Sequence, residues 1–243
     1  MKLKELFAKF IDKYFYNPKW RCVVCEKEIF DDNKYVCDEC DKELPYNIGA
    51  ICDHCGRKVI SFENYCSTCK GILVSLDKCR SVYNYEKPIS TLIQRAKYNG
   101  AKYLLEFFAK DLANLYLQQY FNADCLTFVP MTEKAEKARG YNQSKVLCEL
   151  VSKKTGVPVL DCVKKVTDTK RQATLSRKER LKNLEHAFRI FNKKQVKDKN
   201  IVIVDDVTTT GSTAEVIADR LKKAGAKRVF LISVASTPPS DKY

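Results

Sequence analysis

The chain lacks any apolar run of the roughly 20 residues that a membrane-spanning helix needs, which excludes an integral membrane protein. Residues 1–15 are too charged for a secretory signal peptide and offer no small-residue cleavage site. The chain also lacks the Gly-Lys-Ser/Thr phosphate loop and the GxGxxG dinucleotide fingerprint, which excludes those two nucleotide-binding motifs. From these absences we expect a cytoplasmic protein, with peripheral attachment at the inner membrane as the alternative.

Length and charge set further bounds. The 243 residues suffice for one medium domain and a small module, but not for two full α/β domains. The formal net charge is +14, and such a basic surface attracts nucleic acid or phosphorylated metabolites. Lysine is spread along the whole chain, so the charge locates no site, and a solvated basic surface is the alternative explanation.

Cysteine is abundant: there are 12, and eight of them form four CxxC pairs. The pairs are Cys22/Cys25, Cys37/Cys40, Cys52/Cys55 and Cys66/Cys69. Thiols stay reduced in the cytosol, so clustered CxxC pairs indicate metal binding rather than disulfides. The gaps between successive pairs are 11, 11 and 10 residues, and each gap fits a structural zinc ribbon.

Eight thiolates complete two tetrahedral sites, so the sequence predicts two structural zinc ions. Neighbouring pairs can share an ion, or the pairs can interleave. We favour neighbours, because closing a shorter loop costs less entropy. An iron–sulfur cluster also accepts four thiolates and is the alternative. His54 lies inside the third pair; because thiolates fill both sites, we expect His54 on the surface and not as a ligand.

The cysteine pairs and the hydrophobic periodicity together divide the chain into three predicted segments. Apolar residues at helical spacing predict an amphipathic helix within residues 1–20, which docks on the rest of the protein or on a partner. Residues 21–78 form a double zinc ribbon, and residues 79–243 form an α/β domain. Helices are expected over 80–120, followed by alternating strands (126–130, 159–163, 201–206, 228–236) and helices (142–154, 213–224). Such alternation predicts a parallel sheet with helices on both faces.

The most specific motif is IVIVDDVTTTGST at residues 201–213. A buried strand delivers Asp205 and Asp206 at its carboxyl end, where ligands of α/β sheets bind. A loop of small residues follows and opens a helix, so its amide groups and hydroxyls form a cradle for an anion. Gly211 permits close approach of a ligand to the backbone. One acid pair beside one cradle suits a ribose 5-phosphate. The carboxylates would accept hydrogen bonds from the two ring hydroxyls, and the cradle would hold the phosphate. The alternative is a strand-to-helix turn rich in capping residues.

This motif resembles the signature of type I phosphoribosyltransferases, which bind phosphoribosyl pyrophosphate. Thr208 stands where those enzymes commonly have an aliphatic residue. Other segments, together with the CxxC ladder, resemble the ComF family of competence-associated proteins from about Cys22 to the C-terminus. They are Val129-Pro130-Met131, Arg139-Gly140-Tyr141-Asn142-Gln143, Arg171-Gln172-Ala173 and, more weakly, Ala96-Lys97-Tyr98-Asn99-Gly100.

The resemblance implies a type I phosphoribosyltransferase-like parallel sheet flanked by helices, with a small N-terminal four-cysteine zinc-ribbon module. It also implies a cytoplasmic role in handling single-stranded DNA during natural transformation, with the competence machinery as partner. In phosphoribosyl transfer, Mg²⁺ accompanies the leaving pyrophosphate. Asp205 and Asp206 are the candidate catalytic residues, and Arg139 and the basic stretch 164–182 are expected to close over the ligand. The full candidate binding set is Asp205, Asp206, Thr209, Thr210, Gly211, Ser212, Thr213 and Arg139.

Two functions follow from these observations. In the first, the protein binds phosphoribosyl pyrophosphate or a related sugar phosphate, together with single-stranded DNA. In the second, it is an active phosphoribosyltransferase that acts on an unidentified acceptor. The sequence shows no pocket for an acceptor base, so ligand binding is better supported than turnover. A scaffold that binds other machinery through the zinc module and the N-terminal helix is a third, weaker hypothesis.

Overall fold

The structure is a computed structural model, and it describes residues 20–31, 33–59, 64–66, 69–70, 74–167, 184 and 186–237. The chain divides into two compact units, Met1–Leu44 and Pro45–Tyr243. We placed the double zinc ribbon at 21–78, whereas this division falls between the second and third CxxC pairs. The predicted N-terminal helix, and most of the basic stretch 164–182, lie outside the described residues.

The described part of the first unit is built around the turn at Cys22–Cys25. Arg21 and Glu28 form an antiparallel bridge across this turn. The short helix α2 (Asp38–Lys42) begins directly after Cys37 and carries Cys40. A segment this small buries little apolar surface, so it needs a metal or a similar cross-link for stability.

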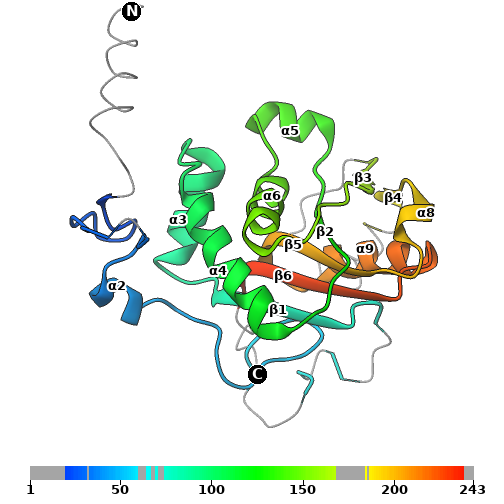
Figure 1. Cartoon of the computed structure of the whole chain (residues 1–243), viewed down its shortest axis with the longest axis horizontal. Coiled ribbons are helices and arrows are strands. Elements are labelled where there is room, and N and C mark those ends of the chain that lie inside the picture. The colour runs from blue at the N-terminus through cyan, green and yellow to red at the C-terminus, as the bar shows by residue number, and fades with distance from the viewer. Residues whose placement is uncertain are drawn as a thin grey trace, which may run out of the picture. The chain divides into compact units, whose positions relative to one another are not determined.

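The second unit contains a four-stranded parallel sheet with the order β1-β6-β5-β2 (Figure 1). The strands are β1 (Lys78–Asn84), β6 (Arg228–Ser236), β5 (Asn200–Thr208) and β2 (Cys125–Phe128). Ser81, Ser233 and Asp205 lie side by side across the three strands β1, β6 and β5. The carboxyl ends of these strands therefore meet at one edge of the sheet.

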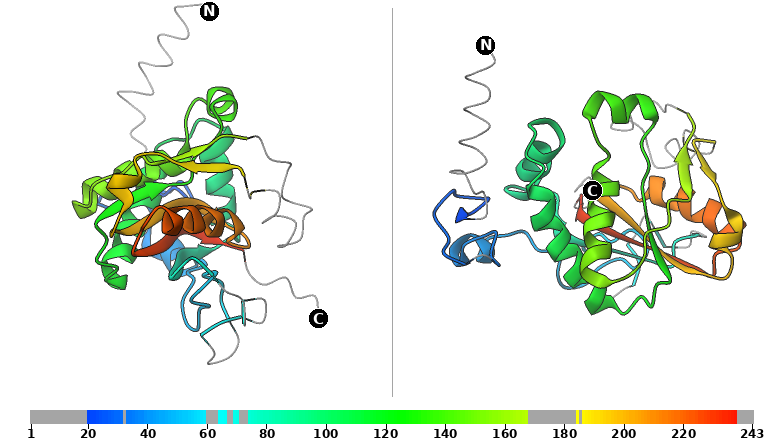
Figure 2. Two further views of the ribbon diagram at one scale, coloured as in Figure 1. Left: turned by 90° about the vertical axis from the view of Figure 1, so that its right-hand side faces the viewer. Right: turned by 45° about the horizontal axis from the view of Figure 1, so that its top comes forward.

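Helices cover both faces of this sheet. α3 (Ile89–Tyr98) and α4 (Leu104–Gln119) follow β1, and the short α5 (Glu133–Arg139) leads into α6 (Gln143–Thr155). α4 and α6 pack against one face, and α9 (Ser212–Lys223) packs against the other (Figures 1 and 2). Because both faces are covered, β5 is buried from Ile201 to Val204 and β6 is buried along almost all of its length.

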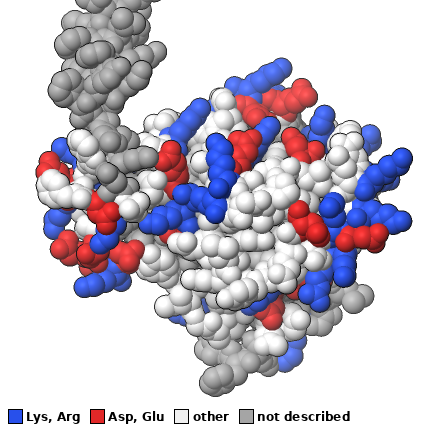
Figure 3. Space-filling model, viewed as in Figure 1, with Lys and Arg blue, Asp and Glu red and all other residues white. Residues whose placement is uncertain are grey.

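A second, antiparallel sheet pairs β3 (Val163–Lys165) with β4 (Phe188–Ile190), and α8 (Lys193–Val196) follows it. These elements are rich in lysine and arginine. Figure 3 shows basic side chains gathered at this right-hand end of the face in view.

The predicted strands and helices from residue 124 onward are largely confirmed, but the helical prediction for the start of 80–120 is wrong. Lys78–Asn84 is strand β1, whose alternate residues are buried and which pairs with β6 from the far end of the chain. The strand predicted at 159–163 is reduced to a single bridge from Val159 to Leu126, and β3 begins only at Val163. Among the described residues, no helix is both long enough and apolar enough to cross a membrane.

Candidate functional site

Two adjacent carboxylates stand at the carboxyl end of β5. Asp205 Oδ1 accepts hydrogen bonds from Ser144 Oγ at 2.8 Å and from the amide of Asp206 at 2.9 Å. Ser144 lies in the first turn of α6, so the helix that covers the sheet also orients this carboxylate. Burial, and then the neighbouring charge of Asp206, raise the pKa of Asp205 to about 7.

The second carboxylate is paired with a lysine from another helix. Lys97 Nζ, near the end of α3, lies 2.7 Å from Asp206 Oδ2, and both side chains are largely buried. Burial opposes the charge on Lys97, but the carboxylate of Asp206 outweighs it and raises the pKa of the ammonium. The site thus joins β5, α3 and α6, and the lysine compensates part of the negative charge of the acid pair.

The loop after Asp206 leads directly into the first turn of α9. Gly211 is the N-cap residue at φ +72°, and no side chain caps the helix, so its first amides remain available to an anion. Open space lies where a Cβ of Gly211 would project. The hydroxyl oxygens of Thr210 and Ser212 are 2.7 Å apart, and Thr209 is exposed. The geometry therefore allows an anion to sit on this turn, beside the carboxylates.

Arg139 stands at the same edge of the sheet, at the end of α5. Its Nη1 donates to Gln143 Oε1 at 2.8 Å, and its Nη2 donates to the hydroxyl of Tyr98 at 3.3 Å. Gln143, the partner of Arg139, lines one small cavity together with Lys97 and Asp206, so Arg139 lies near the acid pair. The structure thus brings Arg139 to the same rim as the predicted residues of β5, although the basic residues 170–180 lie outside the described part of the chain.

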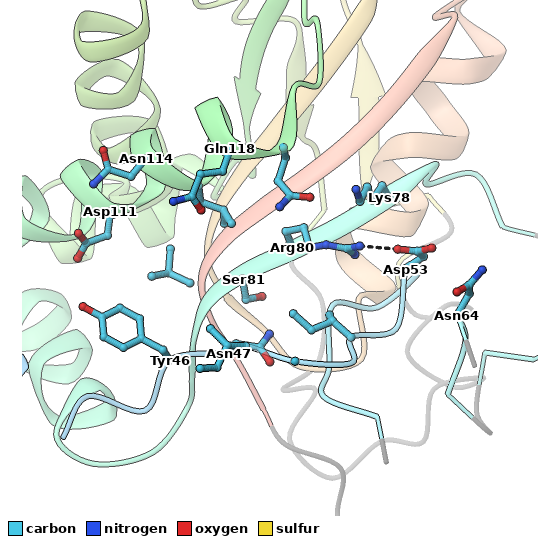
Figure 4. Close-up of a pocket in the computed structure, with 16 residues that line it drawn as sticks. Tyr46, Asn47, Asp53, Asn64, Lys78, Arg80, Ser81, Asp111, Asn114 and Gln118 are labelled. Atoms are coloured by element: carbon cyan, nitrogen blue, oxygen red, sulfur yellow. Dashed lines mark hydrogen bonds and ion pairs between the residues drawn. The ribbon is translucent and has the colours of Figure 1, made fainter. Parts of the chain in front are cut away.

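A separate hollow of about 840 Å³ lies along β1, the outermost strand of the sheet (Figure 4). Arg80 points at Asp53 there, with Nη2 and Oδ1 2.5 Å apart, and Asp111 accepts a hydrogen bond from Tyr83 at 2.6 Å. The hollow is bordered by the C-terminal half of α4, and the C-terminal end of a helix is electrostatically negative. These features do not favour an anionic ligand, so we place no sugar phosphate in this hollow.

The eight CxxC cysteines form two groups, Cys22/Cys25/Cys37/Cys40 and Cys52/Cys55/Cys66/Cys69. Within each group all Sγ atoms lie within 4.8 Å of one another. Cys25 and Cys37 have their sulfurs 3.8 Å apart, and Cys55 and Cys66 have theirs 3.7 Å apart. Four thiolates at about 2.3 Å from a tetrahedral zinc ion would be separated by about 3.8 Å. Both groups therefore fit zinc, and the prediction that neighbouring pairs share an ion is confirmed.

The second cysteine group is tied to the sheet and to α9. Asp53 O accepts from the amide of Cys79 at 2.7 Å, and Gly56 O accepts from Ser236 Oγ at 3.3 Å. His54 is only 3% exposed, and its Nε2 lies 3.6 Å from Glu215 Oε2 in the first turn of α9. The prediction that His54 is a surface residue is therefore wrong, because α9 covers it.

Two family models match the sequence. A double zinc ribbon domain matches residues 13–70, and a phosphoribosyl transferase domain matches residues 144–242. "Competence protein F" of Haemophilus influenzae is 31% identical over 189 residues, which cover 74% of this chain and 82% of that protein. The chain belongs to the ComF family.

Two other relatives fit this assignment. "DNA utilization protein YhgH" of Escherichia coli K12 is 34% identical over 164 residues, which cover 61% of this chain and 67% of that protein. "Competence protein ComFC" of Bacillus subtilis is 25% identical over 147 residues, which cover 60% of this chain and 58% of that protein. The chain combines zinc ribbons with a type I phosphoribosyltransferase fold, which confirms the architecture predicted from the sequence.

The structure explains one departure of this ComF-family member from the phosphoribosyltransferase pattern. Thr208 is buried, and its hydroxyl donates to Ser233 Oγ at 2.9 Å, which in turn lies 2.7 Å from Ser81 Oγ. The side chain is thus part of a hydroxyl network within the sheet. It replaces an aliphatic residue without leaving a buried polar group unpaired.

Sequence reasoning missed Lys97 and Ser144 as members of the site. Lys97 lies in the AKYNG segment, which we used only as a weak mark of the family. Ser144 is the second residue of α6, directly after the quoted segment that ends at Gln143. Both residues are distant in sequence from Asp205. The only indication of their role was that they lie in or next to segments that resemble the family.

Proposed function

We propose that this chain binds phosphoribosyl pyrophosphate or a related sugar phosphate, and that it acts in the uptake or processing of DNA. The observation that carries the first part is the position of Asp205 and Asp206 beside the uncapped N-terminus of α9. The printed names of the relatives, competence protein and DNA utilization protein, support the second part.

Each group of the site has a role in this proposal. Asp205 and Asp206 accept the two ring hydroxyls of the ribose, and the amides at residues 211–213 hold the 5-phosphate, with the hydroxyls of Thr209, Thr210, Ser212 and Thr213 as further donors. Lys97 keeps Asp206 in place, and Ser144 does the same for Asp205. Arg139 lies toward the pyrophosphate. The carboxylate oxygens suit Mg²⁺, which supplies charge compensation on the pyrophosphate when it is bound.

Calorimetry tests the ribose site. Phosphoribosyl pyrophosphate with Mg²⁺ is titrated into the zinc-loaded wild type and into the double variant Asp205→Asn/Asp206→Asn. We expect the wild type to bind and the variant, with unchanged zinc content and circular dichroism, to lose detectable binding, because amides cannot replace two charged acceptors. Equal affinity of the two proteins would show that the ribose is held elsewhere.

The basic end formed by β3, β4 and α8 supports the proposed contact with single-stranded DNA. Lys164 Nζ lies 4.8 Å from the ring centroid of Phe191, which is 41% exposed. A hollow of about 360 Å³ is lined by residues of β4, α8 and α9, among them Arg189, Lys193 and Lys223. Exposed aromatic rings among cations are typical of surfaces that bind single strands, since bases stack on the rings while cations neutralise phosphates.

Fluorescence anisotropy with a labelled single-stranded oligonucleotide tests this contact. Affinity should fall steeply as salt rises, and Lys193→Ala/Lys194→Ala should weaken binding and reduce the salt dependence. The matched control is Lys153→Ala/Lys154→Ala at the end of α6, which removes the same charge from another exposed site. Absent or salt-independent binding by the wild type would reject the proposal.

Phosphoribosyl transfer to an unidentified acceptor is the second candidate function, and the matched phosphoribosyl transferase domain favours it. A panel of heterocyclic bases incubated with phosphoribosyl pyrophosphate and Mg²⁺ should then release pyrophosphate. If no acceptor causes release while calorimetry shows binding, the protein is a binding protein and not a transferase.

A further inference from the structure

A hollow of about 440 Å³ lies at the amino-terminal edge of the main sheet, at the opposite ends of the strands from the acid pair. The first residues of three neighbouring strands line it: Lys78 of β1, Asn200 of β5 and Arg228 of β6. Lys227 and the end of α4 also belong to its wall. Three cations therefore border this hollow, and its described lining contains no carboxylate.

The carboxylates that lie closest in sequence to this lining are already engaged. Asp77 Oδ2 lies 2.7 Å from Lys222 Nζ, and Asp124 Oδ2 accepts from the amide of Asn200 at 2.7 Å. None of the three cations of the hollow forms an ion pair with a residue that the structure describes. Partial burial, and then the charge of Arg80, lower the pKa of Lys78. A negatively charged group in this hollow would therefore be stabilised.

The hollow continues into the larger one along β1. Lys78 and Gln119 line both, so the hollows of about 440 Å³ and about 840 Å³ form one trough. In the larger part the charges balance, because Arg80 is paired with Asp53. Its walls are rich in carboxamides, with Asn114 and Gln118 on the α4 side and Asn47 and Asn64 on the segment before β1 (Figure 4).

Several polar groups of the trough are open to hydrogen-bond donors. Asn200 Nδ2 donates to the carbonyl of Asn122 at 3.1 Å, which leaves the buried Asn200 Oδ1 without a donor. Asn114 and Gln118 are exposed, and their carboxamides bond to no other described residue. The last turn of α4 contains no basic residue, and the final carbonyls of a helix have no partner within the helix. A fitting ligand brings N–H donors as well as negative charge.

We propose that this trough binds an extended acidic segment of a partner protein. A carboxamide offers one acceptor and an N–H donor, as a peptide group does, so the Asn and Gln side chains can pair with an extended backbone. Carboxylates of the segment would meet Lys78, Lys227 and Arg228. Single-stranded nucleic acid would also satisfy the cations, but its sugar-phosphate backbone has no N–H donors. The trough and the proposed sugar-phosphate site lie at opposite edges of the sheet, so this inference does not depend on that site.

Phage display of random peptides on the zinc-loaded full chain tests the proposal. We expect the selected peptides to be enriched in Asp and Glu. The best of them is then synthesised with a fluorescent label and measured by anisotropy. Its affinity should fall about tenfold or more in Lys227→Ala/Arg228→Ala, and equally when its acids are replaced by amides, because hydrogen bonds between charged groups are the strong ones. Hydrogen exchange should slow at residues 78–82 and 119–122 when the peptide binds.

Two further variants separate the trough from general attraction. The net charge of +14 draws acidic peptides to the whole surface, so Lys153→Ala/Lys154→Ala, which removes the same charge from α6, is the matched control. We expect it to change the affinity by less than about twofold. Asn114→Ala/Gln118→Ala removes two carboxamides and no charge, and it should weaken the peptide about threefold to tenfold while the affinity for single-stranded DNA stays the same.

Three results would overturn the proposal. The first is a selection without acidic enrichment. The second is an equal loss of affinity in Lys227→Ala/Arg228→Ala and in Lys153→Ala/Lys154→Ala, with zinc content and circular dichroism unchanged, which would indicate general attraction. The third is displacement of the peptide by an oligonucleotide whose own affinity falls in Lys227→Ala/Arg228→Ala, which would make the trough a nucleic-acid surface. Binding of ribose 5-phosphate should stay the same in every variant, so failure here leaves the sugar-phosphate site intact.

Discussion

The CxxC knuckles at Cys22–Cys25 and Cys52–Cys55 share one pattern of backbone hydrogen bonds. The amides of Cys22 and Cys52 donate to the residues five positions later, Lys27 and Arg57, both at 2.8 Å. The amides of the residues after the second cysteines donate back to Cys22 and Cys52, both at 2.9 Å. Isolated antiparallel bridges close both turns.

The surroundings of the two knuckles differ. The first has two valines between its cysteines and belongs to the unit Met1–Leu44. The second has Asp53 and His54 there, which contact Arg80 on β1 and Glu215 on α9. The same kind of metal-binding turn therefore has two roles. In the first unit it is the main source of stability, and in the second unit it is part of the phosphoribosyltransferase core.

The residue after the second cysteine shows the same contrast. Glu26 and Gly56 both adopt the left-handed conformation, at φ +63° and φ +71°. Glu26 is exposed, so the first knuckle tolerates a side chain there. At Gly56 a Cβ would come within 2.8 Å of Cys79 Sγ, so contact with β1 requires glycine.

Breaking one metal site at a time is the change with the largest expected effect. Cys55→Ser should destabilise the second unit by more than about 4 kcal/mol, because loss of a structural metal is among the most destabilising changes. It should also weaken sugar-phosphate binding, since the knuckle contacts the first turn of α9. The matched variant Cys25→Ser should leave that affinity within about twofold, a difference of about 0.4 kcal/mol.

Calorimetry with ribose 5-phosphate, hydrogen exchange of residues 212–223 and a zinc assay measure these effects. Equal loss of affinity in Cys55→Ser and Cys25→Ser would contradict the difference between the two sites.

The contact between the second knuckle and α9 gives an intermediate effect. Glu215 accepts from the amides of Ser75 at 2.5 Å and Leu76 at 3.4 Å, besides facing His54. Glu215→Ala leaves these donors without their acceptor and should lower the free energy of unfolding of the second unit by about 2–3 kcal/mol. Glu215→Gln keeps an acceptor and should lose less. Urea unfolding at saturating zinc measures both, and an alanine variant as stable as wild type would show that the contact does not stabilise α9.

The smallest of the three effects is the overpacking at Gly56, taken apart from the left-handed strain that the substitution also adds. Gly56→Ala should cost about 1–3 kcal/mol through overpacking against Cys79, in addition to left-handed strain. The control is Gly49→Ala at φ +96°, where no atom lies within 4 Å of the added Cβ, so only the strain remains. The difference between the two variants in thermal unfolding isolates the contact. If they lose the same stability, the second knuckle is not packed as tightly on β1 as the structure indicates.

Local patterns predicted much of this architecture. The CxxC spacing predicted both metal sites, and the lower entropy cost of closing short loops favoured the pairing of neighbours that the structure shows. The apolar run of β5 and the small residues after it located the acid pair and the turn before α9. The local sequence of these elements specifies their structure through strand length, turn residues and capping.

The rest depends on contacts between distant residues. β1 was predicted as helix although its residues alternate between buried and partly buried, and its partner β6 lies near the other end of the chain. His54 is buried, and it faces Glu215 on α9, which is distant from it in sequence. Lys97 pairs with Asp206 through the placement of α3, which no local pattern specifies.

A crystal structure of the zinc-loaded protein with phosphoribosyl pyrophosphate and Mg²⁺ tests the central claim most directly. We predict density for the 5-phosphate on the amides of residues 211–213 and for the ribose hydroxyls at Asp205 and Asp206. Density for the ligand in the hollow beside β1, or at the basic end formed by β3, β4 and α8, with the turn before α9 left empty, would contradict it.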